Sequence, residues 1–113
     1  MLLVNAFSLN MLPAKGTMSI NATPVSLEEA RDILATYGVE SAVGHTDTAN
    51  LLTGLLGLPV YAERRTVTVP EAGAYMMVAQ YSGPRLPEGA TTLPEGATIT
   101  WWTVRVAPAF WGE

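Results

Sequence analysis

The sequence contains one histidine, His45, and histidine is the residue type that ordinarily gains and loses its proton near neutral pH. Gly44 precedes it, and an apolar helix is expected to follow through Leu51 and Leu56. The first backbone N–H groups of a helix lack partners within the helix and attract anions. A histidine there can become protonated when a phosphate binds and then act as a general acid. A lone histidine is more often a helix cap or a surface residue, so both interpretations stay open.

Further polar residues fall on expected loops. Ser8 and Asn10 follow the first expected strand, where ligands of open sheets tend to bind, although taken alone they are better explained as turn residues. Arg85 suits a bidentate phosphate clamp, but a solvated loop arginine is the commoner case. Glu88 could orient Arg85 or a ribose hydroxyl. Glu95 holds the same place in a short repeat, so spacing does not choose between the two glutamates.

The remaining candidates have equally plain structural explanations. Thr46, Asp47 and Thr48 suit N-terminal helix caps as well as ligands. Trp101 and Trp102 are adjacent on an expected strand and therefore point to opposite faces of the sheet. At most one of them can stack on a base, and the other is expected in the core or at a dimer contact.

The amino-acid composition excludes several classes of ligand and reaction. The chain has ten acidic and six basic residues and a formal net charge of -4, so no basic stripe is present to hold long DNA or RNA. A small anionic ligand held by two or three local donors stays compatible with this charge. The absence of cysteine excludes disulfides, thiolate metal sites and a cysteine nucleophile. One histidine cannot build a histidine-rich metal cluster, and the acidic group Glu28, Glu29 and Asp32 reads as helix-surface charge. We therefore expect a mechanism without metal or cofactor.

The length of the chain predicts the number of domains, and its first residues bear on where in the cell the protein is found. A chain of 113 residues is expected to form one domain, 1–113. Its first apolar run has no preceding basic region and is interrupted by Asn5 and Asn10, which is too short and too polar for a signal peptide or membrane span. A cytoplasmic protein without a membrane partner is expected, in the host cytoplasm if the protein is viral.

Hydrophobic spacing and turn residues predict the elements. Ser26 and Glu29 have the spacing of a capping box, which predicts a helix that runs to about Tyr37 and ends at Gly38. The residues of this helix expected to face the core are Leu27, Ala30, Ile33, Leu34 and Tyr37. Strands are expected at residues 1–4, 17–22, 64–69, 74–81 and 98–106, with a turn at 70–73.

A short repeat separates the last two expected strands. The sequence LPEGAT at residues 86–91 returns at 93–98, and its prolines and glycines favour loops and turns over a helix. The order of strands and helices predicts a small α/β domain of the α+β kind. In it, the helices lie mainly on one face of a mixed sheet.

Three segments carry a resemblance to a known family. Residues 5–12, NAFSLNML, resemble the N-terminal signature of the viral ring nucleases, which are type III anti-CRISPR proteins typical of archaeal viruses. Residues 44–48, GHTDT, are similar to the glycine-histidine segment of that family, and 80–89, with QYS followed by RLPEG, to its third block. The segments occur in the family's order, and the resemblance spans nearly the whole chain.

The resemblance implies a homodimer with a five-stranded mixed sheet, flanking helices and a pocket for cyclic tetra-adenylate across the dimer interface. It implies a reaction without metal or cofactor, in which a 2′-hydroxyl of the substrate attacks the adjacent phosphorus and leaves linear products with 2′,3′-cyclic phosphate ends. By the same resemblance His45 would be the general acid, Arg85 would steady the charge on phosphorus, and Glu88 would belong to the same catalytic site. The substrate-binding positions would be Ser8, Asn10, Asn5, Gly44 and Thr46.

The chain departs from the family pattern between its last strands. Some relatives carry a helix where this chain has the repeat at 86–98, and Gly83 and Pro84 are extra residues ahead of Arg85. Two other functions stay open at this point. One is a module that sequesters the nucleotide without cutting it, and the other is a viral structural or regulatory protein with no nucleotide ligand.

Overall fold

The computed structural model describes residues 1–13, 15–64, 67, 74–87, 89–90 and 92–108. The elements in chain order are β1 (Leu2–Val4), the 3-10 helix η1 (Leu9–Met11), β2 (Met18–Val25), α1 (Leu27–Tyr37), β3 (Glu40–Ser41), α2 (Thr46–Leu56), β4 (Ala74–Ser82) and β5 (Thr98–Pro108). Within these described residues, no helix is both long and apolar enough to cross a membrane.

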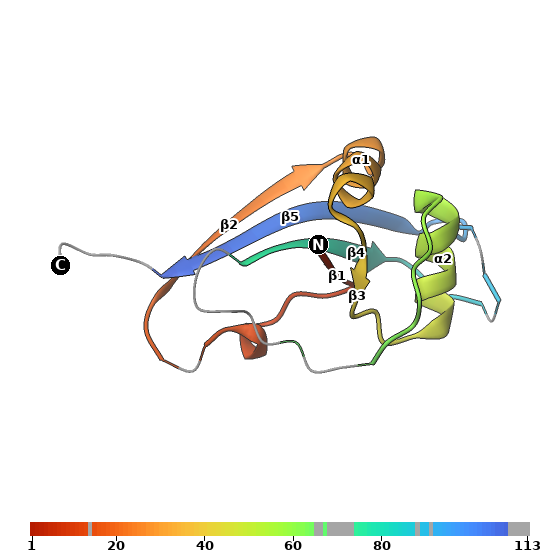
Figure 1. The fold of residues 1–113 in the computed structure, drawn as a ribbon. Helices are drawn as coiled ribbons and strands as arrows, with labels where there is room; N and C mark the ends of the chain where they lie inside the picture. Colours follow the sequence, from red (N-terminus) through yellow and green to blue (C-terminus); the bar gives the residue numbers. More distant parts are fainter. Residues whose placement is uncertain (14, 65–66, 68–73, 88, 91, 109–113) are drawn as a thin grey trace.

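The strands form one mixed five-stranded sheet, as predicted, and their order in it is β2-β5-β4-β1-β3 (Figure 1). Strand β1 pairs in parallel with both β3 and β4, whereas β5 is antiparallel to β4 and β2. Because β1, β3 and β4 run in the same direction, the loops that follow them leave from the same edge of the sheet.

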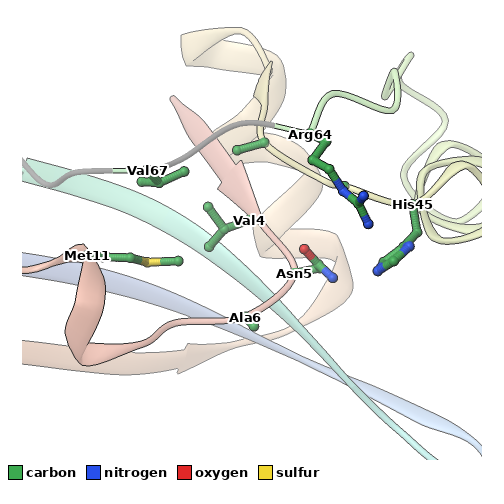
Figure 2. A pocket seen from close by; sticks show the side chains of 9 residues that line it. Val4, Asn5, Ala6, Met11, His45, Arg64 and Val67 are labelled. Atoms are coloured by element: carbon green, nitrogen blue, oxygen red, sulfur yellow. The ribbon is translucent and has the colours of Figure 1, made fainter.

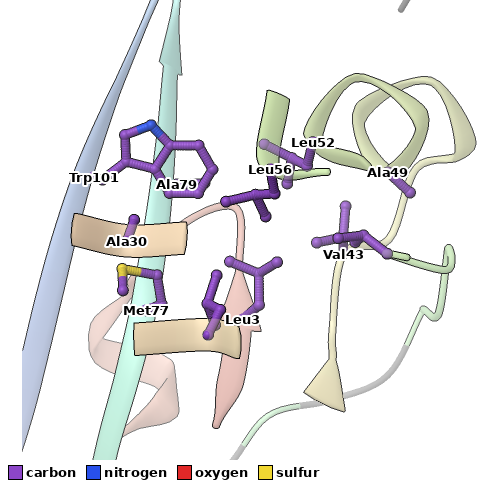
Figure 3. Close-up of a cluster of buried hydrophobic side chains, with 11 residues drawn as sticks. Leu3, Ala30, Val43, Ala49, Leu52, Leu56, Met77, Ala79 and Trp101 are labelled. Carbon is purple, nitrogen blue, oxygen red and sulfur yellow. The ribbon is translucent and has the colours of Figure 1, made fainter. Parts of the chain in front are cut away.

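The two faces of the sheet are covered differently. Met77, Ala79 and Trp101 lie on the face covered by both helices, where Ala30 of α1 and Leu52 of α2 are fully buried in the same cluster (Figure 3). The neighbouring residues along β4 and β5 point the other way and meet Phe7, Met11 and Leu12 from the segment after β1. This alternation is the period of two that strands require, and it confirms that the helices lie on one face.

The paired tryptophans follow the same alternation. Trp101 is only 4% exposed in the helix-side core, and Trp102 is partly buried on the opposite face, as expected. Trp102 borders an open, mostly apolar groove of about 280 Å³, whose lining residues are Phe7, Ile20, Ala22, Val78, Gln80, Trp102 and Val104.

Helix α1 has the predicted start and end. Ser26 accepts a hydrogen bond from the N–H of Glu29, whose carboxylate accepts one from the N–H of Ser26, and Gly38 is the C-cap. The prediction that Tyr37 faces the core is wrong, since its side chain is 66% exposed. The helix ends at this residue, and no further turn follows to cover the ring.

The expected strand at 64–69 does not account for the fifth strand. Arg64 and Val67 are not in a strand, and the other residues of that segment, like the turn expected at 70–73, lie outside the described residues. The fifth strand is instead β3, which has two residues and is too short to show alternation in the sequence. Strands β2 and β5 are each longer than expected, and the whole of β2 pairs with residues 101–108 of β5.

The repeated segments form turns rather than a helix, as predicted. In each copy the alanine N–H donates to the proline carbonyl three residues earlier, from Ala90 to Pro87 and from Ala97 to Pro94. The glycine before each alanine has a positive φ, which is favourable only for glycine.

The hydroxyl of Thr53 ties α2 to the segment that leaves it. Its oxygen accepts a hydrogen bond from the N–H of Val60 at 2.9 Å, and it lies 2.9 Å from the carbonyl oxygen of Ala49 and 3.1 Å from that of Val60. Val60 is 4% exposed, so water cannot easily replace the hydroxyl.

We expect Thr53→Val to lower the free energy of unfolding by about 1–3 kcal/mol, because it keeps the side-chain volume and leaves the Val60 N–H without its partner. Urea denaturation followed by far-UV circular dichroism measures the change. Thr53→Ser keeps the hydroxyl and should lose much less. Equal stability of the valine variant and the wild type would contradict the role of the hydroxyl.

Candidate functional site

The shared edge of β1, β3 and β4 brings together residues that are far apart in the sequence. Asn5 directly follows β1, and Gly44 and His45 follow β3 after Ala42 and Val43. The N–H of Ala42 donates to the carbonyl of Leu3 at 2.9 Å. The parallel pairing therefore continues past β3 and keeps the segments that follow β1 and β3 adjacent.

His45 is the N-cap residue of α2, with extended backbone angles of φ -125° and ψ 132°. Its carbonyl accepts the first helical hydrogen bond, from the N–H of Ala49, but its side chain does not cap the helix. The imidazole is exposed, and among the residues that the structure describes it has no hydrogen-bond partner. The ring is therefore available to a ligand at the helix N-terminus, where unpaired N–H groups favour an anion.

Arg64 reaches the same place from another segment. The N–H of Glu63 donates to the carbonyl of Val43 at 2.8 Å, which holds residues 63–64 beside residues 43–44. The Arg64 side chain lies 3.9 Å from the position that a Cβ on Gly44 would take, which is an ordinary van der Waals contact. Sequence reasoning missed this residue, because it read Arg64 as the start of a strand.

These residues line an open pocket of about 220 Å³, here called the His45 pocket (Figure 2). The side chains of Asn5, His45 and Arg64 point toward one another at its mouth. The full lining is Val4, Asn5, Ala6, Met11, Ala42, Gly44, His45, Arg64 and Val67. An amide, an imidazole and a guanidinium above an apolar floor supply hydrogen-bond donors and positive charge, which suits a phosphate or another small anion.

Other predicted positions lie outside this pocket. Ser8 is the N-cap of η1, and its hydroxyl accepts a hydrogen bond from the N–H of Asn10 at 3.2 Å. Asn10 and Thr46 are exposed, and like Ser8 they do not line the pocket. Of the five predicted substrate-binding residues, the structure thus brings Asn5 and Gly44 together with His45.

The segment after β4 approaches from the other side of α2 (Figure 1). Asp47, in the first turn of α2, accepts a hydrogen bond through Oδ1 from the N–H of Gly89 at 3.3 Å. Arg85, earlier in the same loop, is exposed and does not line the His45 pocket. Glu88 lies outside the described residues, and the alternative Glu95 is exposed.

The described part of the chain contains no group of three histidine, cysteine, aspartate or glutamate side chains arranged to hold a metal ion. The described acids near the site are Asp47, which bonds the loop, and Glu63, whose backbone pairs with Val43. The chemistry that these residues offer is anion binding and proton donation.

Comparison with known proteins agrees with the fold. The sequence profile of the family described as STIV B116-like matches residues 1–99. Among solved structures, B116 of Sulfolobus turreted icosahedral virus is similar, with 27% sequence identity, a TM-score of 0.73, and coverage of 91% of this chain and 96% of B116. A comparison with curated proteins finds no match. Because the family profile spans most of the chain, the protein belongs to the STIV B116-like family.

Proposed function

We propose that the protein is a ring nuclease that cuts cyclic tetra-adenylate without a metal ion and so switches off type III CRISPR signalling. The observation that carries the proposal is the convergence of His45, Arg64 and Asn5 on one pocket at the N-terminus of α2. Membership of a family represented by a protein of an archaeal virus supports a viral origin, and with it an anti-CRISPR role.

The pocket supplies what a transesterification within the substrate requires. The nucleophile is a 2′-hydroxyl of the ring, so the protein contributes position, charge stabilisation and a proton. Arg64 would bind the scissile phosphate, with Asn5 as a neutral hydrogen-bond partner. The imidazole of His45 already faces the pocket and makes no competing hydrogen bond within the described residues.

In the proposed reaction the 2′-oxygen forms a bond to phosphorus, its proton passes to water, and the bond from phosphorus to the 5′-oxygen breaks. Protonated His45 gives its proton to the departing 5′-oxygen and is reprotonated by solvent. The products are a 2′,3′-cyclic phosphate and a free 5′-hydroxyl. Negative charge gathers on the phosphorus oxygens in the transition state, and the guanidinium of Arg64 is suited to stabilise it.

The loop after β4 would complete the site. In this proposal Arg85 adds a second positive charge near the phosphate, and Glu88 orients Arg85 or a ribose hydroxyl. Gly44 lets the phosphate approach the backbone before α2, and Ser8, Asn10 and Thr46 contact the outer part of the ring.

We further propose a homodimer as the active form. A pocket of about 220 Å³ is smaller than those that enclose drug-sized ligands, whereas cyclic tetra-adenylate has four nucleotides. One copy can therefore hold one corner of the ring. A two-fold related copy would place a second His45 at the opposite phosphate, and cleavage at both would yield two linear di-adenylates.

Substitution of His45 by alanine should lower cleavage of cyclic tetra-adenylate by about a hundred- to ten-thousand-fold, because the leaving oxygen loses its proton donor. The assay is incubation in excess EDTA followed by chromatography of the products. Asn50→Ala changes an exposed residue of the same helix outside the pocket and should cleave like the wild type.

Three results would contradict this assignment. If the ring survives incubation with the wild type, the protein does not cut this substrate, and binding alone would indicate a sequestering module. If the wild type and His45→Ala cleave at the same rate, His45 is not the general acid. A requirement for added divalent metal would refute the metal-free mechanism.

Replacing Arg64 with alanine should lower kcat/KM by about 10- to 100-fold, the loss expected for one hydrogen bond to a charged group. Arg105→Ala removes the same charge at the far end of the sheet, where Arg105 stacks on Tyr75, and should change kcat/KM little. Equal effects of the two substitutions would show that Arg64 acts only through the net charge of the protein.

The dimer proposal predicts a molar mass in solution of twice 12.0 kDa. Multi-angle light scattering after size exclusion measures it directly, with and without cyclic tetra-adenylate. A mass of one chain under both conditions, together with full activity, would show that a single copy suffices.

A further inference from the structure

We infer that Asp47 is a positioning residue that docks the loop carrying Arg85 onto the start of α2, beside His45. The inference rests on the proposed function for its consequence in catalysis, but the contact itself does not. Asp47 lies two residues after His45, and its hydrogen-bond partner Gly89 lies four residues after Arg85. One hydrogen bond therefore connects the first turn of α2, next to His45, to the loop that carries Arg85.

The contact joins two otherwise separate parts of the chain. The carboxylate oxygen Oδ1 of Asp47 lies 3.3 Å from the backbone nitrogen of Gly89, across 42 positions of sequence. An aspartate in the first turn of a helix usually stabilises its own helix through its charge near the unpaired N–H groups. In the described residues this carboxylate bonds the loop instead, which gives it a role beyond that of a helix cap.

The loop is braced at its base, so a single contact at its tip can position it. The hydroxyl of Tyr81 donates to the carbonyl of Pro84, next to Arg85. Gly83 has a φ of +144°, and a Cβ at this position would lie 2.6 Å from Cα of Ala97. The two arms of the loop thus touch at a point where only glycine fits. The turn from Pro87 to Ala90 then presents the N–H of Gly89 to Asp47.

The charge of Asp47 and its hydrogen bond to Gly89 should affect the site in opposite ways. A carboxylate within two residues of an anion site repels the phosphate and opposes the attraction of the helix N-terminus. Loss of the carboxylate alone would therefore tighten anion binding. Loss of the hydrogen bond would instead release the loop that carries Arg85 and weaken catalysis. The two effects have opposite signs, and two substitutions separate them.

Asp47→Asn removes the charge and keeps an acceptor oxygen, whereas Asp47→Ala removes both. We expect Asp47→Asn to retain kcat within about two-fold and to lower KM, and Asp47→Ala to lower kcat by about three- to ten-fold, the range of one modest hydrogen bond. Asp32→Ala removes an exposed acid from α1 and should leave both constants unchanged.

Amide hydrogen exchange measured by NMR tests the contact without any substrate. The Gly89 amide should exchange several-fold faster in Asp47→Ala than in the wild type or Asp47→Asn, while amides in the core of α2 should not change. Unchanged exchange at Gly89 would overturn the docking role. Equal kinetics of the asparagine and alanine variants would show that only charge matters and would also overturn it.

Amide exchange at Gly89 and the cleavage assay together separate the docking role of Asp47 from the proposed reaction. If Gly89 exchanges faster in Asp47→Ala and the wild type leaves the ring intact, the docking contact stands and the proposed reaction fails. If the wild type cuts the ring and Gly89 exchange is insensitive to Asp47, the reaction stands and the docking role fails.

Discussion

The parallel pairing of β1 with both β3 and β4 is the constraint on which the candidate site depends. Parallel strands cannot be joined by a tight turn, so the chain must cross over between them, and α1 lies on the crossover from β1 to β3. As a result, the residues after β1 and β3 come together at one edge although they are about forty positions apart. An antiparallel pairing of β1 with β3 would send Asn5 and His45 to opposite edges.

Local sequence signals are sufficient to predict the helices, whose ends are marked by capping residues. Ser26 and Glu29 are three residues apart and bond each other, so both the pattern and its result are local. The glycine after each helix could be predicted for the same reason. Strand β3 could not be predicted, because its two residues gain their structure only from pairing with β1. Its position depends on a partner far away in the sequence.

The residues of the site also differ in whether local sequence or pairing between distant segments places them. The place of His45 at the start of α2 follows from local sequence, and the structure bears it out. Arg64 lines the pocket because the neighbouring Glu63 N–H donates to the carbonyl of Val43. The sequence of the segment 60–64 contains no pattern that predicts this pairing. Ser8 was a better candidate by resemblance than by geometry, since its hydroxyl caps a 3-10 helix in this structure. Non-local backbone pairing decides which polar residues share a pocket.

A net charge of -4 is compatible with an anion site because charge acts locally at this scale. Interactions between exposed charges weaken beyond about 8–10 Å at physiological salt, so acids elsewhere on the surface matter less to a phosphate than the guanidinium of Arg64 in the pocket. Asp47 differs from these distant acids, because it lies in the first turn of α2, two residues after His45. Its bond to Gly89 offers a physical reason to keep a negative charge there. A charge that would oppose anion binding can thus hold in place the loop that carries Arg85.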